Sequence, residues 1–200
     1  AKGAGMIEPN MATMLGYLTT DATVEPKALQ ACLSAAVAVS FNRITVDGDM
    51  STNDTVLLMA NGAAGNRTLS PRHRQWKTFV AAVNTVTKEL ALKIVKDGEG
   101  ATKFVTITVK GAANAADARK ASRAVANSLL VKTSWFGCDP NWGRVIDAVG
   151  YSGAQVDEAL PNGQTPLMWA ASEGHTEVVG LLLAAGAGLH TRLASGFNAW

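Results

Sequence analysis

Cysteine is scarce in this 200-residue sequence, which contains only Cys32 and Cys138. Two cysteines so far apart do not suggest a disulfide framework, and neither has the second cysteine or nearby histidine that a zinc site needs. We therefore expect no metal site. We also expect a reducing compartment, the cytoplasm, because disulfide-poor sequences are typical of it.

Long apolar runs and an excess of one charge are also lacking. No run reaches the length of a membrane span, and the net charge is only +2, with 17% charged residues. Such a balance gives no electrostatic reason to expect a nucleic acid or a membrane surface as partner. The hydrophobic content is 48%, enough to bury a core in one domain or slightly more.

Apolar residues recur at helical spacing in three segments. The pattern predicts helices over residues 26–41 and 71–96, the second introduced by Ser70 and Pro71 as cap and first turn. A third helix is expected from Asn114, with one apolar face formed by Ala118, Ala121, Val125 and Leu129.

Two segments have the pattern of strands. Residues 55–60 form a continuous apolar run, which predicts a strand buried on both faces. Residues 105–109 alternate apolar residues with threonine, which predicts a half-buried strand. Strands that alternate with long helices predict a layered α/β domain.

The last forty residues have a different pattern. Residues 162–192 resemble one ankyrin repeat, with a short helix, a break at Gly174, and a second helix over residues 177–185. Gly196 lies 33 residues after Gly163, which is the ankyrin period, so a second repeat begins near the end of the sequence. One repeat cannot bury its own apolar face, and Leu181, Leu182 and Leu183 therefore need another partner.

The string KGAGMIEPNMATMLGYLTTDA, residues 2–22, places Thr13 directly after Ala12 in an apolar run. A threonine hydroxyl is a weak nucleophile that needs an adjacent base, and cutting the chain before it supplies one in the new α-amine. An Ala-Thr pair alone is equally typical of a buried strand threonine. The long string resembles the cleavage segment of the bifunctional ornithine acetyltransferase / glutamate N-acetyltransferase family of arginine biosynthesis.

Three further strings resemble the same family and occur in the family's order. They are ITVDGDMSTNDT (residues 44–55), KDGEGATK (96–103) and LLVKTSWFGCDPNWGR (129–144). The resemblance covers residues 1–156. It implies a layered helix/sheet sandwich of the self-cleaving acetyltransferase type, followed by a junction at 157–161 and an all-α ankyrin-like segment at 162–200.

The resemblance implies a reaction. The precursor is expected to cut itself between Ala12 and Thr13, and Thr13 then carries acetyl from N-acetylornithine to the amine of glutamate. Some members also accept acetyl-CoA as donor, and no cofactor is implied. The competing interpretation of the chain is a protein-binding module, in which an ankyrin array follows a degraded enzyme segment. A third interpretation, an aminopeptidase of the related self-cleaving superfamily, fits the long strings less closely.

The resemblance also implies residues that bind substrate. Lys2 matches a family lysine whose ammonium suits the carboxylate of acetylornithine and glutamate, although a solvated terminal lysine is the plainer interpretation. Glu99 matches a glutamate that holds the substrate amine, in a string that would otherwise be interpreted as a turn. Asn53 and Asp54 are further candidates for lining the site, and the resemblance gives them no role. Asp47 begins a pattern that faintly resembles a calcium loop but lacks the required glycine and glutamate.

In this family the donors that stabilise the oxyanion lie upstream of the cut. We therefore expect an upstream chain as obligate partner, in a heterotetramer of two copies of each chain. A second group of substrate contacts, an Asn and a Thr or Ser, is replaced here by the ankyrin-like tail. We expect the isolated chain to have little or no activity.

Overall fold

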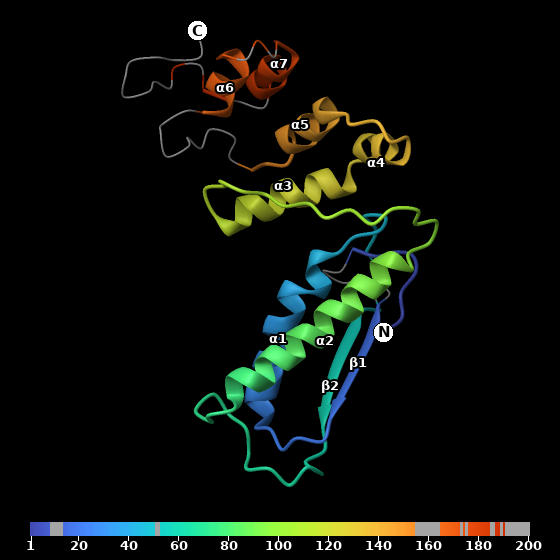
Figure 1. The fold of residues 1–200 in the computed structure, drawn as a ribbon, viewed down its shortest axis with the longest axis vertical. Coiled ribbons are helices and arrows are strands. Elements are labelled where there is room, and N and C mark those ends of the chain that lie inside the picture. The colour runs from blue at the N-terminus through green and yellow to red at the C-terminus, as the bar shows by residue number, and fades with distance from the viewer. Residues whose placement is uncertain are drawn as a thin grey trace. The chain divides into compact units, whose positions relative to one another are not determined.

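The fold is seen in a computed structural model, which divides the chain into two compact units, Ala1–Phe104 and Val105–Trp200 (Figure 1). The residues that it describes are 1–8, 14–50, 53–154, 165–172, 174, 176–184, 187–188 and 190.

The first unit contains a parallel pair of strands. Strand β1 (Leu15–Thr20) pairs with β2 (Thr55–Ala60), with Leu15 opposite Thr55 and Thr20 opposite Ala60. Parallel strands need a long crossover connection, and here it contains helix α1 (Pro26–Val39) and the short helix η1 (Phe41–Arg43). This arrangement and the helices of both units confirm the predicted α/β class.

Helices α1 and α2 (Trp76–Lys96) lie side by side and cover one face of the two strands (Figure 1). Their covered face is lined by alternate strand residues, of which Leu58 packs against α1 and α2. A second cluster joins β2, η1 and α2, and Phe41, which is completely buried, lies in it. Together these two clusters form the core of the unit.

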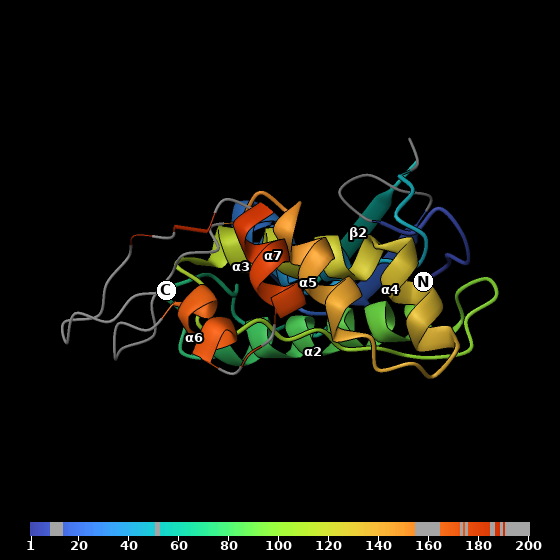
Figure 2. The same cartoon turned by 90° about the horizontal axis from the view of Figure 1, so that it is seen from above.

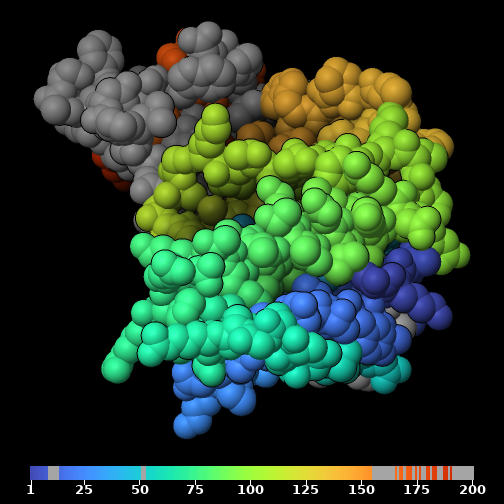
Figure 3. All heavy atoms as spheres, turned by 60° about the horizontal axis from the view of Figure 1, so that its bottom comes forward, coloured from blue at the N-terminus to red at the C-terminus, as the bar shows by residue number. Residues whose placement is uncertain are grey.

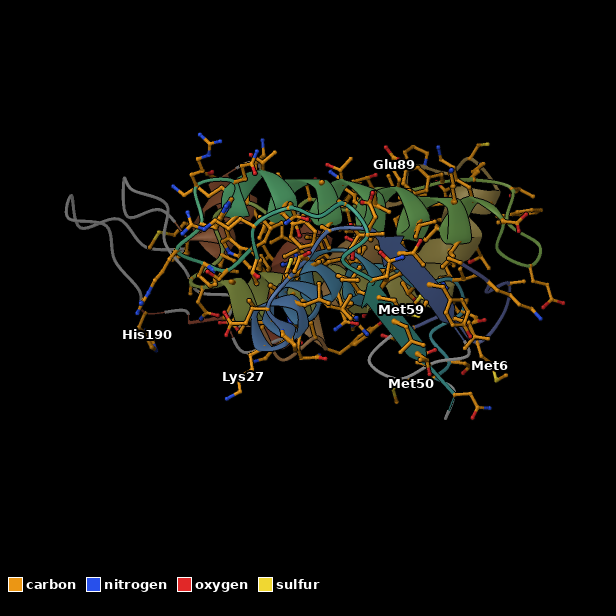
Figure 4. All side chains as sticks on the ribbon, turned by 90° about the horizontal axis from the view of Figure 1, so that it is seen from below. Met6, Lys27, Met50, Met59, Glu89 and His190 are labelled. Atoms are coloured by element: carbon orange, nitrogen blue, oxygen red, sulfur yellow. The ribbon has the colours of Figure 1, made fainter. Side chains whose placement is uncertain are left out.

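The predicted bounds of β2 are confirmed, but its predicted burial on both faces is wrong. Leu57 and Met59 are 44% and 50% exposed, and Tyr17 on β1 is 54% exposed. Met59 projects from β2 on the side away from α2 (Figure 4). The helices cover a single face, so every second apolar side chain of the run lies on the open face.

The helix predicted over residues 26–41 is α1, which ends at Val39 because Ser40 leaves the helical conformation and donates its hydroxyl to the Ala36 carbonyl. The helix predicted over 71–96 ends at Lys96 as expected but begins at Trp76. Turns occupy the intervening residues, and the amide of Trp76 donates to the carbonyl of His73.

The second unit is helical in the part of it that the structure describes. Helix α3 (Ala115–Asn127) begins as predicted, with Asn114 Oδ1 accepting hydrogen bonds from the amides of Ala116 and Asp117, each at 2.9 Å. The sequence pattern placed Leu129 on the apolar face of this helix, and that prediction is wrong. Leu129 begins helix α4 (Leu129–Phe136), is 74% exposed, and follows Ser128, whose side chain caps α4.

Residues 105–109 do not form the predicted strand. No described segment lies beside them as a partner strand, and Ile107 instead packs onto the core of α3, α4 and α5 (Trp142–Gly150). Only Ile107 of the alternating face packs there, since Val105 and Val109 are 41% and 36% exposed, and without a partner strand the pattern alone does not make a strand.

The predicted ankyrin-like helix pair is present as α6 (Pro166–Ser172) and α7 (Thr176–Ala184), separated by Gly174 at φ +72°. A single ankyrin repeat needs another element to cover its apolar face, and here helix α5 packs against the pair. Leu182 lies in a buried cluster of the pair against which Ile146 of α5 packs, and α7 lies beside α5 (Figure 2). Leu183 stays 36% exposed. No helix in the described part of the chain is long and apolar enough to cross a membrane.

Candidate functional site

The N-terminal segment, residues 1–8, is joined to β1 directly. The amide of Lys2 donates to the Leu15 carbonyl at 2.8 Å, and the amide of Leu15 donates to the Lys2 carbonyl at 3.0 Å, which makes an isolated antiparallel bridge. The predicted site residue Lys2 is thereby placed beside the start of β1, with its side chain exposed. Figure 3 shows the N-terminal residues, in dark blue, against the green segment that follows α2.

Asp47 also binds this segment, through backbone groups. Its Oδ2 accepts the amide hydrogen of Met6 at 2.7 Å, and its Oδ1 accepts that of Ile7 at 2.9 Å. The amide of Val46 donates to the Ile7 carbonyl at 2.7 Å. Met6 has φ +52°, a left-handed conformation that is unfavourable for a residue with a side chain, and the Asp47 carboxylate compensates by satisfying the amides of the bend.

Glu99 also binds the N-terminal segment, next to Asp47. Its amide donates to the Ala4 carbonyl at 2.7 Å, immediately after α2 ends. Its carboxylate lies against Gly5, where an added Cβ would come within 3.0 Å of Glu99 Oε2. Gly5 thus permits a close approach that a larger residue would obstruct. The structure brings the two predicted substrate-binding residues, Lys2 and Glu99, to one short segment.

Ala12 and Thr13, the predicted cleavage pair, lie outside the described residues, but Met14 directly after them is fixed at three points. Its amide donates to Asp54 Oδ1, its carbonyl accepts from the Thr55 amide at 2.9 Å, and its side chain is 2% exposed in the core. The residue that follows the predicted nucleophile is therefore fixed by Asp54 and Thr55, the last two residues of the string at 44–55.

Asp54 itself is unusual among the described residues, because its Oδ2 is buried and accepts no hydrogen bond from them. Desolvation by burial raises the pKa of this carboxyl group, while the hydrogen bond from the Met14 amide lowers it. Such a group is a candidate for function, since buried polar atoms are normally paired. Asn53, beside it, is exposed at its position before β2.

Sequence reasoning gave no role to Asp47 and Asp54, and both prove to bind backbone amides about 40 residues earlier in the chain. The sequence offered one signal for these roles: both aspartates lie in the string at residues 44–55, which leads into strand β2. Among the described residues, no group of three or more His, Cys, Asp or Glu side chains could hold a metal ion.

A hollow elsewhere in the first unit is lined by Arg67, Arg72, His73 and Arg74 with neighbouring polar residues. None of its lining residues belongs to the four strings. The site built from the N-terminal segment, Asp47, Asp54 and Glu99 is therefore separate from it in sequence and in its contacts.

Comparison with known proteins gives two family matches. The sequence model of the ArgJ family matches residues 1–175, and that of the ankyrin repeat matches residues 162–192. The two matches overlap at residues 162–175.

Individual relatives match over most of this chain. The arginine biosynthesis bifunctional protein ArgJ of Geobacter sulfurreducens is 60% identical over 157 residues, covering 78% of this chain and 40% of that protein. The Bacillus subtilis protein of the same name is 54% identical over 156 residues, covering 78% and 38%. The chain thus spans about two fifths of the length of these curated relatives.

The fold also matches a solved structure. The crystal structure of arginine biosynthesis bifunctional protein ArgJ from Bacillus halodurans superposes with a TM-score of 0.70 at 49% identity, covering 74% of this chain and 70% of that one.

Proposed function

Because this chain belongs to the ArgJ family, we propose that it is the part of an arginine-biosynthesis acetyltransferase that carries the nucleophile, Thr13. In this proposal the enzyme moves acetyl from N-acetylornithine to glutamate through an acetyl-threonine intermediate. Acetyl-CoA is a second acetyl donor of the same chemistry. The observation that carries the proposal is the fixation of Met14 through its amide, carbonyl and side chain.

Maturation comes first. The Thr13 hydroxyl attacks the Ala12 carbonyl carbon, the peptide C–N bond breaks, and the chain passes to an ester on the threonine oxygen. Breaking the C–N bond frees the α-amine of Thr13, and water then hydrolyses the ester, which leaves the Ala12 carboxylate and restores the Thr13 hydroxyl. This amine is the base that the hydroxyl needs.

Acetyl transfer follows in two balanced steps. The Thr13 oxygen attacks the acetyl carbonyl of N-acetylornithine, its proton passes to the α-amine, and the ornithine amine leaves with a proton. The glutamate amine then attacks the acetyl ester, the ester C–O bond breaks, and the hydroxyl is restored. Fixing Met14, the residue next to the nucleophile, serves both steps, because a fixed geometry removes much of the entropic part of the barrier.

Lys2 and Glu99 are proposed to bind the substrates. The Lys2 ammonium complements the α-carboxylate that acetylornithine and glutamate share, and the Glu99 carboxylate complements their amines. Lys2 precedes the cut, so it would belong to the other product chain. Its backbone bridge to Leu15 and the hydrogen bonds of Met6 and Ile7 to Asp47 would keep that segment in place after cleavage.

The open face of the sheet supports an obligate partner. Tyr17, Leu57 and Met59 leave an exposed apolar surface on two strands, and a two-stranded sheet with one covered face is marginal alone. We propose that the partner is the upstream part of the relatives, which the chain does not span, in a heterotetramer of two copies of each chain. This partner would also supply the oxyanion donors, so the isolated chain should transfer little acetyl.

Cleavage tests the proposal. The upstream segment of the Geobacter sulfurreducens relative is fused before Ala1, and the intact masses of the products are measured. The expected result is a new chain that begins at Thr13, and its absence from the otherwise identical Thr13→Ala variant. Thr23→Ala, a threonine outside the site, should be cleaved like the wild type. An intact wild-type fusion in a folded sample would refute the proposed nucleophile.

The second candidate function is an ankyrin-type protein-binding module. It is favoured by the ankyrin match at residues 162–192 and by the helix pair α6 and α7 with its buried cluster. The two functions differ in whether they need the Thr13 hydroxyl. Binding of a protein partner through α6 and α7 would survive Thr13→Ala, whereas acetyl transfer would not.

A further inference from the structure

The hollow in the first unit gathers positive charge, and we call it the arginine hollow. It has a volume of about 710 Å³ and is lined by Arg67, Arg72 and Arg74 together with His73 and neighbouring polar residues. Small-molecule sites typically have volumes of about 300–1,000 Å³ and mainly apolar linings. The arginine hollow has the volume of such a site but offers cationic and polar groups, so the ligand that suits it is an anion.

The charge of the arginines is not balanced by acidic residues around them in the sequence. Residues 55–88 contain neither Asp nor Glu, and their positively charged residues are Arg67, Arg72, Arg74, Lys77 and Lys88. The guanidinium groups of the three arginines form no ion pair with a described residue. Each therefore keeps its N–H donors for an incoming acceptor. Like charges that line one hollow repel each other, and a bound anion would relieve this repulsion.

Two acidic residues are in contact with the loop that carries the arginines, but only through their backbone groups. The Ala64 amide donates to the Asp21 carbonyl at 2.8 Å, and the Glu25 amide donates to the Leu69 carbonyl at 3.0 Å. Neither the Asp21 nor the Glu25 carboxylate forms an ion pair with a described residue. The arginines therefore keep their charge unpaired although carboxylates occur in the adjoining segment.

Hydrogen bonds fix the loop that forms the hollow. Asn66 Oδ1 accepts the amide hydrogen of Thr23 at 2.8 Å, and Asn66 Nδ2 donates to the Arg67 carbonyl at 2.8 Å. At the other end of the loop, His73 Nδ1 accepts the amide hydrogen of Gln75 at 3.2 Å. The neutral His73 ring then carries its proton on Nε2, which adds a donor to the hollow. Because the loop is held in place before a ligand arrives, binding costs less conformational entropy.

The arginine hollow follows the carboxyl end of a parallel strand. Strand β2 ends at Ala60, and the loop that carries the arginines leads from there into α2. This connection lies at the arrowhead ends of β1 and β2, away from the N-terminus (Figure 1). Ligands of open α/β folds bind outside the carboxyl ends of the strands. The positive end of the α2 dipole adjoins the same loop and favours an anion there.

We propose that the arginine hollow binds a phosphorylated small molecule through a diphosphate group. Planar guanidinium groups match phosphate oxygens and bind them in pairs, and three of them balance the charge of a diphosphate ester. The volume leaves room for an organic part beside the phosphates. With a net charge of only +2, the chain lacks the strongly basic balance that is typical of nucleic-acid-binding proteins. The inference does not depend on the proposed function, because acetyl transfer through Thr13 needs no group of this hollow.

Calorimetric titration of the whole chain tests the assignment. The probes are ADP and inorganic pyrophosphate, and adenosine is the uncharged comparison. ADP and pyrophosphate should each bind in a one-to-one ratio, whereas adenosine should not bind. Arg72→Gln removes one charged donor and should weaken the binding of both probes about tenfold. Arg72→Lys keeps the charge without the planar fork and should restore part of this loss. Arg74→Gln is a second variant with the same expectation as Arg72→Gln.

Arg119→Gln is the matched control. Arg119 is an exposed arginine of α3 that lies outside the hollow and forms no ion pair with a described residue. Its replacement changes the net charge by the same amount and should leave binding within about twofold of the wild type. Equal weakening by Arg72→Gln and Arg119→Gln would overturn the inference, since binding would then report net charge alone. Circular dichroism confirms that each variant is folded.

Two other results would overturn the inference. One is the absence of binding by folded wild-type protein at about 1 mM ADP and pyrophosphate in low salt. The other is tighter binding of a single-stranded oligonucleotide than of ADP, with the oligonucleotide lost in Arg72→Gln, because the hollow would then serve a nucleic acid.

The outcome is distinguishable from that of the proposed function. Thr13→Ala should bind ADP like the wild type, because Thr13 is not among the residues that line the hollow. Failure of ADP to bind would refute the ligand assignment while self-cleavage still supports the nucleophile. An uncleaved fusion that binds ADP would refute the nucleophile and support the ligand assignment.

Discussion

Met14 offers a direct test of how the candidate site is anchored. It is 2% exposed and packs in the cluster of Ile7, Phe41 and Ile94. Met14→Ala removes three heavy atoms from a buried side chain and leaves a cavity, for which losses of about 2–5 kcal/mol are typical. We expect a loss of about 3 kcal/mol in the free energy of unfolding of the first unit.

The assay is urea unfolding of the whole chain, followed by far-ultraviolet circular dichroism. With an m value of about 2 kcal/mol/M, this loss lowers the midpoint by about 1.5 M. Amide hydrogen exchange in peptides from α1 and α2 assigns the change to the first unit, because local exchange reports the stability of each region separately.

Met50→Ala is the matched control, because it deletes the same atoms from a side chain that is 64% exposed and projects into solvent (Figure 4). Its effect should stay within about 0.5 kcal/mol. If the two substitutions moved the midpoint equally, Met14 would not be a core anchor, and the argument that it fixes the site would fail.

Three further predictions concern other parts of the chain. Gly98→Ala would place a Cβ 3.0 Å from both γ-carbons of Val46, and this overpacking should cost about 1–3 kcal/mol; an unchanged melting temperature would contradict it. Asn114→Ala removes the cap of α3 and should cost about 1 kcal/mol, seen as faster amide exchange in the first turn of that helix, while unaltered exchange would argue against a stabilising cap. Cys138 is exposed, whereas Cys32 is buried and burial raises the pKa of its thiol, so the thiolate, which is the reactive form, is scarcer at Cys32. A thiol reagent should label Cys138 quickly and Cys32 only on unfolding, and equal labelling rates in native protein would show this assignment to be wrong.

The elements predicted well from sequence are those whose apolar pattern is long or continuous. Helices α1, α2 and α3 were located by periodicity, and β2 by an apolar run of strand length. Periodicity could not show that only one face of β2 is covered, because this depends on the helices that pack across that face. Local composition is the same on both faces of the run.

The short helices α4 and α5 were missed, although their caps are visible in the sequence. Ser128 accepts a hydrogen bond from the amide of Val131, and Asn141 accepts one from that of Arg144 at 3.1 Å. A polar residue three positions before an orphan amide is the usual start signal of a helix.

The residues of the site were predicted only in part, for a reason of distance along the chain. Lys2 and Glu99 were found by resemblance, and the structure brings both to the N-terminal segment. The roles of Asp47 and Asp54 depend on partners 40 and 41 residues away. No local pattern encodes which backbone amide a carboxylate will meet at that separation.

That separation ties the site to the sheet. Leu15 pairs with Thr55 in the register of β1 and β2, an offset of 40 residues. Asp54 meets the amide of Met14, and Asp47 Oδ1 meets that of Ile7, at the same offset. A slip of one residue between the parallel strands would turn either Leu18 or Leu58 away from the helices. It would also move Asp54 off the residue that follows Thr13, so burial of the core selects the register in which the carboxylate reaches the nucleophile's neighbour.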